Sequence, residues 1–347
     1  MIFTAGGGLF VAIWAMAAGM LIAPRSVLPL SVRFTSGAVL VSTGVFALLA
    51  AHAGYLPIWL SLGAIVIGIA ASQIRTLTFP RLPQMNWWFR ALFACYSAVY
   101  LVYVFAPEIQ PDAVTYHLGL VWEYVRLHSF SSRLGFYELL PQGVEMLFVP
   151  AFAIGAHSAA KLVHFSFLLA TVQMIRHISL ELGISDTRAC CATAIFFIAP
   201  VNAVTSTSAY TDAALVCCCC AVTWLAIRWE RSRDTRLMIL AALNAGFCYT
   251  IKPTFGWVVA VAFAFFAVRS KHRIGVAWFA VTAARHNSNA FWSLLYVPPH
   301  PAGNAAAICS IPRRRSSVGF VRPKKSEIFP PVFPFTKKTR FQNSLIA

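Results

Sequence analysis

Three polar segments interrupt an otherwise apolar chain, and each contains a group that could act on a charged substrate. They are APEIQPDAVTYHLGLVWEYVRLHSFSSRLGFYELLPQGVEMLF at 106–148, NAVTSTSAYTDAAL at 202–215 and CYTIKPTFGW at 248–257. The first two supply the carboxylates of Asp112 and Asp212, and the third supplies the amine of Lys252. A carboxylate can take a proton from an acceptor hydroxyl, and a cation can stabilise a departing phosphate. This combination is suited to transfer of a sugar from a lipid phosphate.

Asp112 follows a proline and opens an apparent helix at 113–128. As a helix N-cap, its carboxylate would accept amide hydrogens of the first turn, and this interpretation needs no catalytic role. The apolar residues of the helix recur at a spacing that suits a helix lying on the membrane, at Val114, Leu118, Val121 and Val125. His117 and Glu123 point towards other faces. Such a helix would hold Asp112 at the boundary between water and lipid, where a lipid-linked substrate presents its head group.

Asp212 and Lys252 also have a structural and a functional interpretation. Asp212 ends a run of hydroxyl residues, together with Tyr210, just before an apolar segment, which is typical of a helix cap. Lys252 lies between two apolar runs, where its side chain can reach water without any other role. A lysine at that depth can also neutralise a phosphate. The sequence alone leaves both interpretations open for each residue.

The composition excludes a soluble fold. Of 347 residues, 59% are hydrophobic and 11% are charged, whereas soluble domains carry roughly 25% charged residues. A soluble domain could not hide this much apolar surface from water, but a bilayer can. The net charge of +17 comes from bases in short clusters between apolar runs. That arrangement is the positive-inside pattern of membrane proteins and argues against nucleic acid as a partner.

The apolar runs predict an all-α polytopic transmembrane protein with about 9–11 spans. The candidate spans are 2–22, 37–53, 56–71, 91–105, 143–156, 159–175, 189–204, 213–227, 237–250, 255–268 and 274–284. The first run is too long for a signal peptide and lacks a basic segment before it, so we expect it to be the first span.

Basic residues predict the orientation in the inner (plasma) membrane. The clusters expected in the cytoplasm are Arg25 with Arg33, Arg75 with Arg81 and Arg90, Arg176 with Arg188, the arginines of 228–236, and Arg269 with Lys271 and Arg273. The segments 108–140 and 204–212 and the neighbourhood of Lys252 then lie outside, the first as a large extracytoplasmic loop. Between Asp112 and Arg176 the number of crossings must be odd, although two apolar runs lie there.

The pattern of span and loop ends near residue 284. We therefore expect a transmembrane domain at 1–284 and a basic, proline-rich tail at 285–347. The tail is either a cytoplasmic extension or the product of a frameshift or truncation that replaced the genuine C-terminus, and we favour the second hypothesis because the apolar pattern stops abruptly.

Nine cysteines occur in the chain, and eight of them lie within apolar runs. The four consecutive cysteines at 217–220 point to all sides of a helix, so they cannot close a tetrahedral metal site together. We expect them to be small apolar residues. We expect no metal site and no required cofactor, although a divalent cation is compatible with the chemistry described above.

The order of the polar segments resembles that of the bacterial GT-C membrane glycosyltransferases, which include protein mannosyltransferases and aminoarabinose transferases. The similar features lie between about 106 and 268 and are Asp112 with the following Tyr116, His117 and Leu118, the stretch LPQGVEMLF with Pro141, Gln142 and Glu145, the run AAKLVH with Lys161 and His164, the motif SAYTD with Tyr210 and Asp212, and the pair Lys252–Pro253. Many members carry adjacent acidic residues in the first loop, whereas Ala113 follows Asp112 here. The family also continues with further spans, which do not follow residue 284.

The resemblance implies transfer of a sugar from a polyprenyl-phosphate donor to an extracytoplasmic glycan, lipid or protein acceptor. Asp112 matches the acidic first-loop residue of the family and would be the catalytic base, while Lys252 would contact the donor phosphate. The other residues expected to bind substrate are Tyr116, His117, Glu123, Gln142, Tyr210 and Asp212. Two alternatives stay open. One is a non-catalytic transporter or flippase for a lipid-linked saccharide, and the other is an inactive truncated product.

Overall fold

The computed structural model describes residues 2–22, 28–73, 84–131, 136–269 and 279–283. These residues form helices joined by short connections and contain no strand. The prediction of an all-α fold is therefore confirmed. The tail at 285–347 lies outside the described residues, as do most of the expected span 274–284 and five of the bases that predicted the orientation, namely Arg25, Arg75, Arg81, Lys271 and Arg273.

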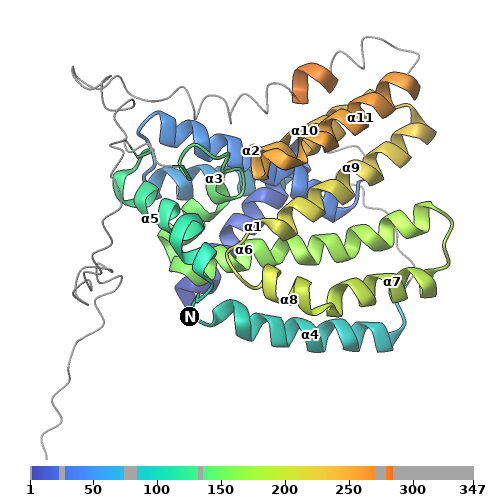
Figure 1. The fold of residues 1–347 in the computed structure, drawn as a ribbon, viewed down its shortest axis with the longest axis horizontal. Coiled ribbons are helices and arrows are strands. Elements are labelled where there is room, and N and C mark those ends of the chain that lie inside the picture. The colour runs from blue at the N-terminus through green and yellow to red at the C-terminus, as the bar shows by residue number, and fades with distance from the viewer. Residues whose placement is uncertain (1, 23–27, 74–83, 132–135, 270–278, 284–347) are drawn as a thin grey trace, which may run out of the picture. The chain divides into compact units, whose positions relative to one another are not determined.

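The helices follow one another in the order shown in Figure 1. They are α1 (Ile2–Ile22), α2 (Leu30–Ala50), α3 (Leu56–Ser72), α4 (Trp87–Phe105), the π-helical turn η2 (Ala113–His117), α5 (Leu118–Leu127), α6 (Glu145–Glu181), α7 (Asp186–Ile198), α8 (Pro200–Ser206), α9 (Asp212–Ser232), α10 (Thr235–Ile251), the 3-10 turn η3 (Pro253–Phe255) and α11 (Gly256–Arg269). Long apolar helices dominate this order, as the composition predicts.

Five helices of the described part are long and apolar enough to cross a membrane, namely α1, α2, α4, α6 and α9. A sixth span forms if α7 and α8 are counted together, although a bend of 61° separates them. The bend follows from Pro200, because a proline disfavours helical dihedrals in the residue before it, and Ala199 is extended. Three further apolar helices have only 10–17 residues. The multi-pass architecture is confirmed, but fewer helices are of full spanning length than the 9–11 expected.

The helix α6 contains both apolar runs that lie between Asp112 and Arg176, where an odd number of crossings is expected. The two expected spans 143–156 and 159–175 form one helix of 37 residues that is broken at Gly155 and Ala156 by non-helical dihedrals. By length and composition this broken helix counts as one candidate span, which is compatible with an odd number of crossings between Asp112 and Arg176.

The helices α1 and α2 cross with their backbones in contact. A Cβ atom added at Gly19 would overlap the carbonyl oxygen of Arg33, and one added at Gly37 would overlap the carbonyl oxygen of Ala15. Helices in a bilayer gain little from the hydrophobic effect between them, so they associate through close packing and interhelical hydrogen bonds. The two glycines permit this packing, and both helices then pack along α6.

Charged residues of opposite sign pair at one end of the bundle. Glu181, at the end of α6, accepts hydrogen bonds from Arg228 and Arg231 of α9, at 3.4 and 2.5 Å. Glu230 pairs with Arg233 at 2.8 Å and with Arg269 at the end of α11. We call this region the basic end. The opposite region, which contains 106–131, 136–144, 199–211 and Lys252, is called the site end.

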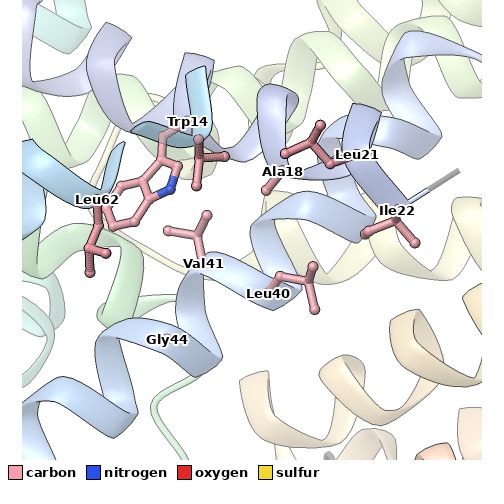
Figure 2. A pocket seen from close by; sticks show the side chains of 9 residues that line it. Trp14, Ala18, Leu21, Ile22, Leu40, Val41, Gly44 and Leu62 are labelled. Atoms are coloured by element: carbon pink, nitrogen blue, oxygen red, sulfur yellow. The ribbon is translucent and has the colours of Figure 1, made fainter. Parts of the chain in front are cut away.

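An apolar groove of about 450 Å³ lies among α1, α2 and α3 (Figure 2). Its lining residues are Trp14, Ala18, Leu21, Ile22, Leu40, Val41, Gly44, Leu62 and Val66. None of them is charged, so the groove offers a surface for hydrocarbon and no group for catalysis. The polar residues that could do chemistry belong to other elements.

Replacing Gly37 with alanine should lower the stability of the protein in detergent by about 1–3 kcal/mol or more, because α1 must move to admit the methyl group. The thermal unfolding midpoint of the purified protein measures this effect. Gly44→Ala is the matched control on the same helix, since a Cβ there meets no atom within 4 Å. Equal midpoints for the two variants would contradict the close crossing of α1 and α2.

Candidate functional site

Asp112 does not act as a helix cap. Its backbone is already helical, with φ −65° and ψ −40°, and its side chain makes no capping hydrogen bond. An N-cap needs non-helical dihedrals, but the helical turn here begins one residue earlier, at Pro111. The amides of Ile109 and Gln110 instead donate to Oε1 of Glu108, at 3.0 and 3.1 Å. Asp112 is exposed and its carboxylate bonds to no other described residue, so it is available to a substrate.

The π-helical turn η2 joins Asp112 to α5. Such turns are rare and occur frequently at functional sites. Burial raises the pKa of the Tyr116 phenol, and the nearby Asp112 carboxylate raises it further. The ring of Tyr116 also stacks on that of Tyr137, with centroids 4.5 Å apart and 3° between the ring planes. The turn therefore places two stacked tyrosines beside the free carboxylate.

His117 connects this turn to the helix bundle. Its Nδ1 lies 2.6 Å from Oε1 of Glu145, and the two residues are only 6% and 5% exposed. Glu145 is the first residue of α6, where the helix dipole favours a negative charge. This buried contact holds the first large loop against the start of α6.

The loop before α9 is held by two further residues. His164 of α6 is fully buried, with Nδ1 at 2.9 Å from the carbonyl oxygen of Ser208 and Nε2 at 3.1 Å from the amide nitrogen of Ala213. Because an amide only donates and a carbonyl only accepts, the ring is neutral and carries its proton on Nδ1. Oε2 of Glu108 accepts a hydrogen bond from the amide of Ala209 at 2.9 Å. These bonds tie the SAYTD motif both to α6 and to the first loop.

Asp212 and Lys252 form an ion pair at the site end. Nζ of Lys252 donates to Oδ1 of Asp212 at 2.5 Å. Asp212 is the first residue of α9, one position after the N-cap Thr211, and Lys252 follows the end of α10, so the pair joins these two helix ends. Their side chains are 43% and 41% exposed, respectively. Both charges can therefore be reached by a ligand from water.

Tyr210 lies within electrostatic range of both aspartates. Burial raises the pKa of the Tyr210 phenol, and the charges of Asp112, Glu108 and Asp212 raise it further. The ring centroid of Tyr210 lies 6.1 Å from that of His117. Six of the residues that the sequence singles out thus gather in one place, which we call the polar cluster, namely Asp112, Tyr116, His117, Tyr210, Asp212 and Lys252.

Two other expected substrate-binding residues have partners elsewhere in the first loop. Oε1 of Glu123 accepts a hydrogen bond from the Ser131 hydroxyl at 2.9 Å, and no described contact joins it to the polar cluster. Nε2 of Gln142 donates to the carbonyl oxygen of Tyr137 at 3.3 Å, so it supports the tyrosine that stacks on Tyr116. A direct role of Glu123 or Gln142 in binding stays a prediction.

Lys161 and His164 help to hold the site end together, and the only sign of this in the sequence is that each is an ionisable residue within an apolar run. The amine of Lys161 donates to the carbonyl oxygens of Tyr103 and Ala106, at 2.8 and 3.0 Å, and so closes the end of α4. Lys161 and His164 lie three residues apart on one face of α6. Ionisable groups inside an apolar run are costly unless they find partners, and this cost is the signal that points to them.

The described residues contain no group of three or more His, Cys, Asp or Glu side chains that could hold a metal ion. Comparison of the chain with models of protein families, with curated proteins and with solved structures gave no match. Membership in the GT-C superfamily therefore stays a prediction. Function is inferred below from the contacts and charges of the polar cluster, together with the resemblance.

Asp112→Asn should lower the pKa of the Tyr210 phenol, because removing a neighbouring negative charge makes the phenolate less unfavourable. The measurement is a pH titration of phenolate absorbance, taken as the difference between each protein and the same protein with Tyr210→Phe. Asp234→Asn, at the opposite end of α10, is the control and should leave the titration unchanged. An unchanged Tyr210 titration in Asp112→Asn would show that Asp112 does not belong to the polar cluster.

Proposed function

We propose that the protein transfers a sugar from a polyprenyl-phosphate donor to an extracytoplasmic glycan, lipid or protein acceptor. The observation that carries this proposal is the free, exposed carboxylate of Asp112 in one cluster with the Asp212–Lys252 ion pair. The cluster lies at one end of an apolar helix bundle, where the head group of a lipid-linked substrate would arrive. The resemblance to GT-C glycosyltransferases supplies the class of donor.

The reaction assigns one task to each charged group. Asp112 takes the proton of the acceptor hydroxyl while the oxygen of that hydroxyl bonds to the anomeric carbon of the sugar. The bond from this carbon to the phosphate oxygen breaks, and its electron pair stays on the departing polyprenyl phosphate. Lys252 neutralises the charge on that phosphate, and Asp212 keeps the amine in place. The hydroxyls of Tyr116 and Tyr210 offer hydrogen bonds to the sugar.

We also propose the lipid bilayer as a partner of the protein. The polyprenyl chain lies among lipids while its phosphate meets the polar cluster. Paired arginines gather at the basic end, so we place that end in the cytoplasm and the site end outside the plasma membrane. A divalent cation is compatible with the exposed Asp112 carboxylate, and the assay below is to be run with and without one.

The main alternative is a transporter or flippase for the same lipid-linked saccharide. Such a protein would need polar residues along a path through its spans. One buried polar contact between helices is that of Asn244, whose Nδ2 donates to Oγ of Ser36 at 3.0 Å. Both residues are almost completely buried and join α10 to α2. Their arrangement supports packing better than a path, which favours the transferase.

Sugar transfer in membrane vesicles supplied with labelled polyprenyl-phosphate sugars should fall by about 100-fold or more in Asp112→Asn, because that variant lacks the base. Lys252→Met should raise KM for the donor, because the amine that meets its phosphate is gone. Asp234→Asn is the control and should keep full activity. It lies at the opposite end of α10 from Lys252, and asparagine also caps helices.

Three other outcomes would change the assignment. Transfer that survives Asp112→Asn would remove Asp112 as the base. Movement of the labelled lipid across the bilayer without transfer would favour the flippase. If the chain neither transfers nor moves any donor, the proposed function is wrong for this chain.

A further inference from the structure

We propose that Glu145 is a positioning residue for His117, whose free Nε2 accepts a hydrogen bond from a hydroxyl group of the bound saccharide. This inference rests on the proposed function and deepens it, because it gives the neutral side of the polar cluster a part in holding the sugar. It also gives Glu145 a purpose beyond that of attaching a loop to α6.

The bond between the two side chains decides which nitrogen of His117 is free. A carboxylate only accepts, so Nδ1 of His117 must carry the proton that points at Oε1 of Glu145, 2.6 Å away. In the neutral ring Nε2 is then the acceptor. Nε2 makes no hydrogen bond with any residue of the described part of the chain. The ring therefore presents an unused acceptor on the side away from Glu145.

Glu145 is held firmly enough to orient a ring. The residue two positions earlier, Gly143, donates its amide hydrogen to the carbonyl oxygen of Thr250 at 2.9 Å. The carbonyl oxygen of Gly143 accepts a hydrogen bond from Ser42 at 2.6 Å. These two bonds fix the start of α6 against α10 and α2. The carboxylate of Glu145 consequently enters the site from a backbone that cannot shift freely.

The second oxygen of Glu145 shows that the pair is more than a structural clasp. Oε2 is buried and has no hydrogen-bond partner. Burying an unpaired oxygen of a carboxylate is costly, so such a group calls for an explanation, of which a role in the chemistry of the site is one. A contact that served only to hold the loop would be more stable with both oxygens bonded or with a neutral partner.

The surroundings of His117 fit a group that touches the sugar. Its ring lies 4.1 Å from that of Tyr116 and 6.1 Å from that of Tyr210, both members of the polar cluster. The titratable groups near the ring are Glu145 and His164 from α6, Tyr116 from the turn η2 and Tyr210 from the loop before α9.

Two amide variants of His117 separate a structural role from contact with the sugar. In His117→Asn the amide nitrogen occupies about the place of Nδ1, so the bond to Glu145 can persist while Nε2 is lost. In His117→Gln the longer side chain can place an amide oxygen near the position of Nε2. We expect transfer to fall about tenfold or more in His117→Asn, as for loss of one hydrogen bond, and to fall less in His117→Gln.

Thermal unfolding midpoints of all variants are measured beside the rates, so that loss of folding is not mistaken for loss of contact.

A nitrogen-15 NMR spectrum of histidine-labelled protein tests the orientation without any activity. The His117 signals, assigned by comparison with His117→Gln, should show a protonated Nδ1 and a bare Nε2 near neutral pH. Glu145→Gln should let the other tautomer appear, because a neutral amide holds Nδ1–H less firmly than a carboxylate does. A bare Nδ1 in the unaltered protein would overturn the inference.

The outcomes also distinguish this inference from the proposed function. If Asp112→Asn abolishes transfer but His117→Asn keeps it, the transferase stands and the role of Nε2 falls. If the unaltered protein transfers no donor, both the proposed function and the contact of Nε2 with the sugar are wrong. The NMR spectrum still decides whether Glu145 orients His117.

Discussion

The site end depends on one helix, because polar side chains of α6 hold all the neighbouring loops. Glu145 binds the first large loop through His117, Lys161 closes the end of α4, and His164 bonds to the loop before α9 on both sides of its ring. In an apolar bundle each of these groups would be costly without a partner. Satisfying them therefore brings both ends of the first large loop and the loop before α9 together along α6.

The ion pairs at the two ends of the bundle set Asp112 apart from Asp212. At the basic end Glu181 and Glu230 each bind two arginines, and at the site end Asp212 binds Lys252. Asp112 alone among the acidic residues of the polar cluster has neither a cation nor a capping role among its described neighbours. A carboxylate left free and exposed beside a cation is what proton transfer next to a phosphate requires. The inferred chemistry follows from this contrast.

Much of the fold could be predicted because a bilayer allows few solutions for an apolar chain. Apolar length and the near absence of charge predict spanning helices, since only a helix satisfies all its backbone groups within one segment. The lengths of the helices were harder to predict, because hydropathy does not show where a helix continues through a loop. The runs at 143–156 and 159–175 form one kinked helix, whereas α3 and α10 match the expected runs 56–71 and 237–250 to within two residues at each end.

By itself, the sequence determined that the protein is helical and membrane-embedded, and that its polar groups lie in three separate segments. Only the tertiary structure decided that these segments meet and what each group does there. Asp112 and Asp212 carry the same signal, a carboxylate before an apolar run, yet one is free and the other is paired with Lys252. A cap is a local property that sequence spacing can suggest. A partner 40 or more residues away is chosen by helix packing, and packing depends on close contacts such as that between Gly19 and the backbone of α2, which no local pattern specifies.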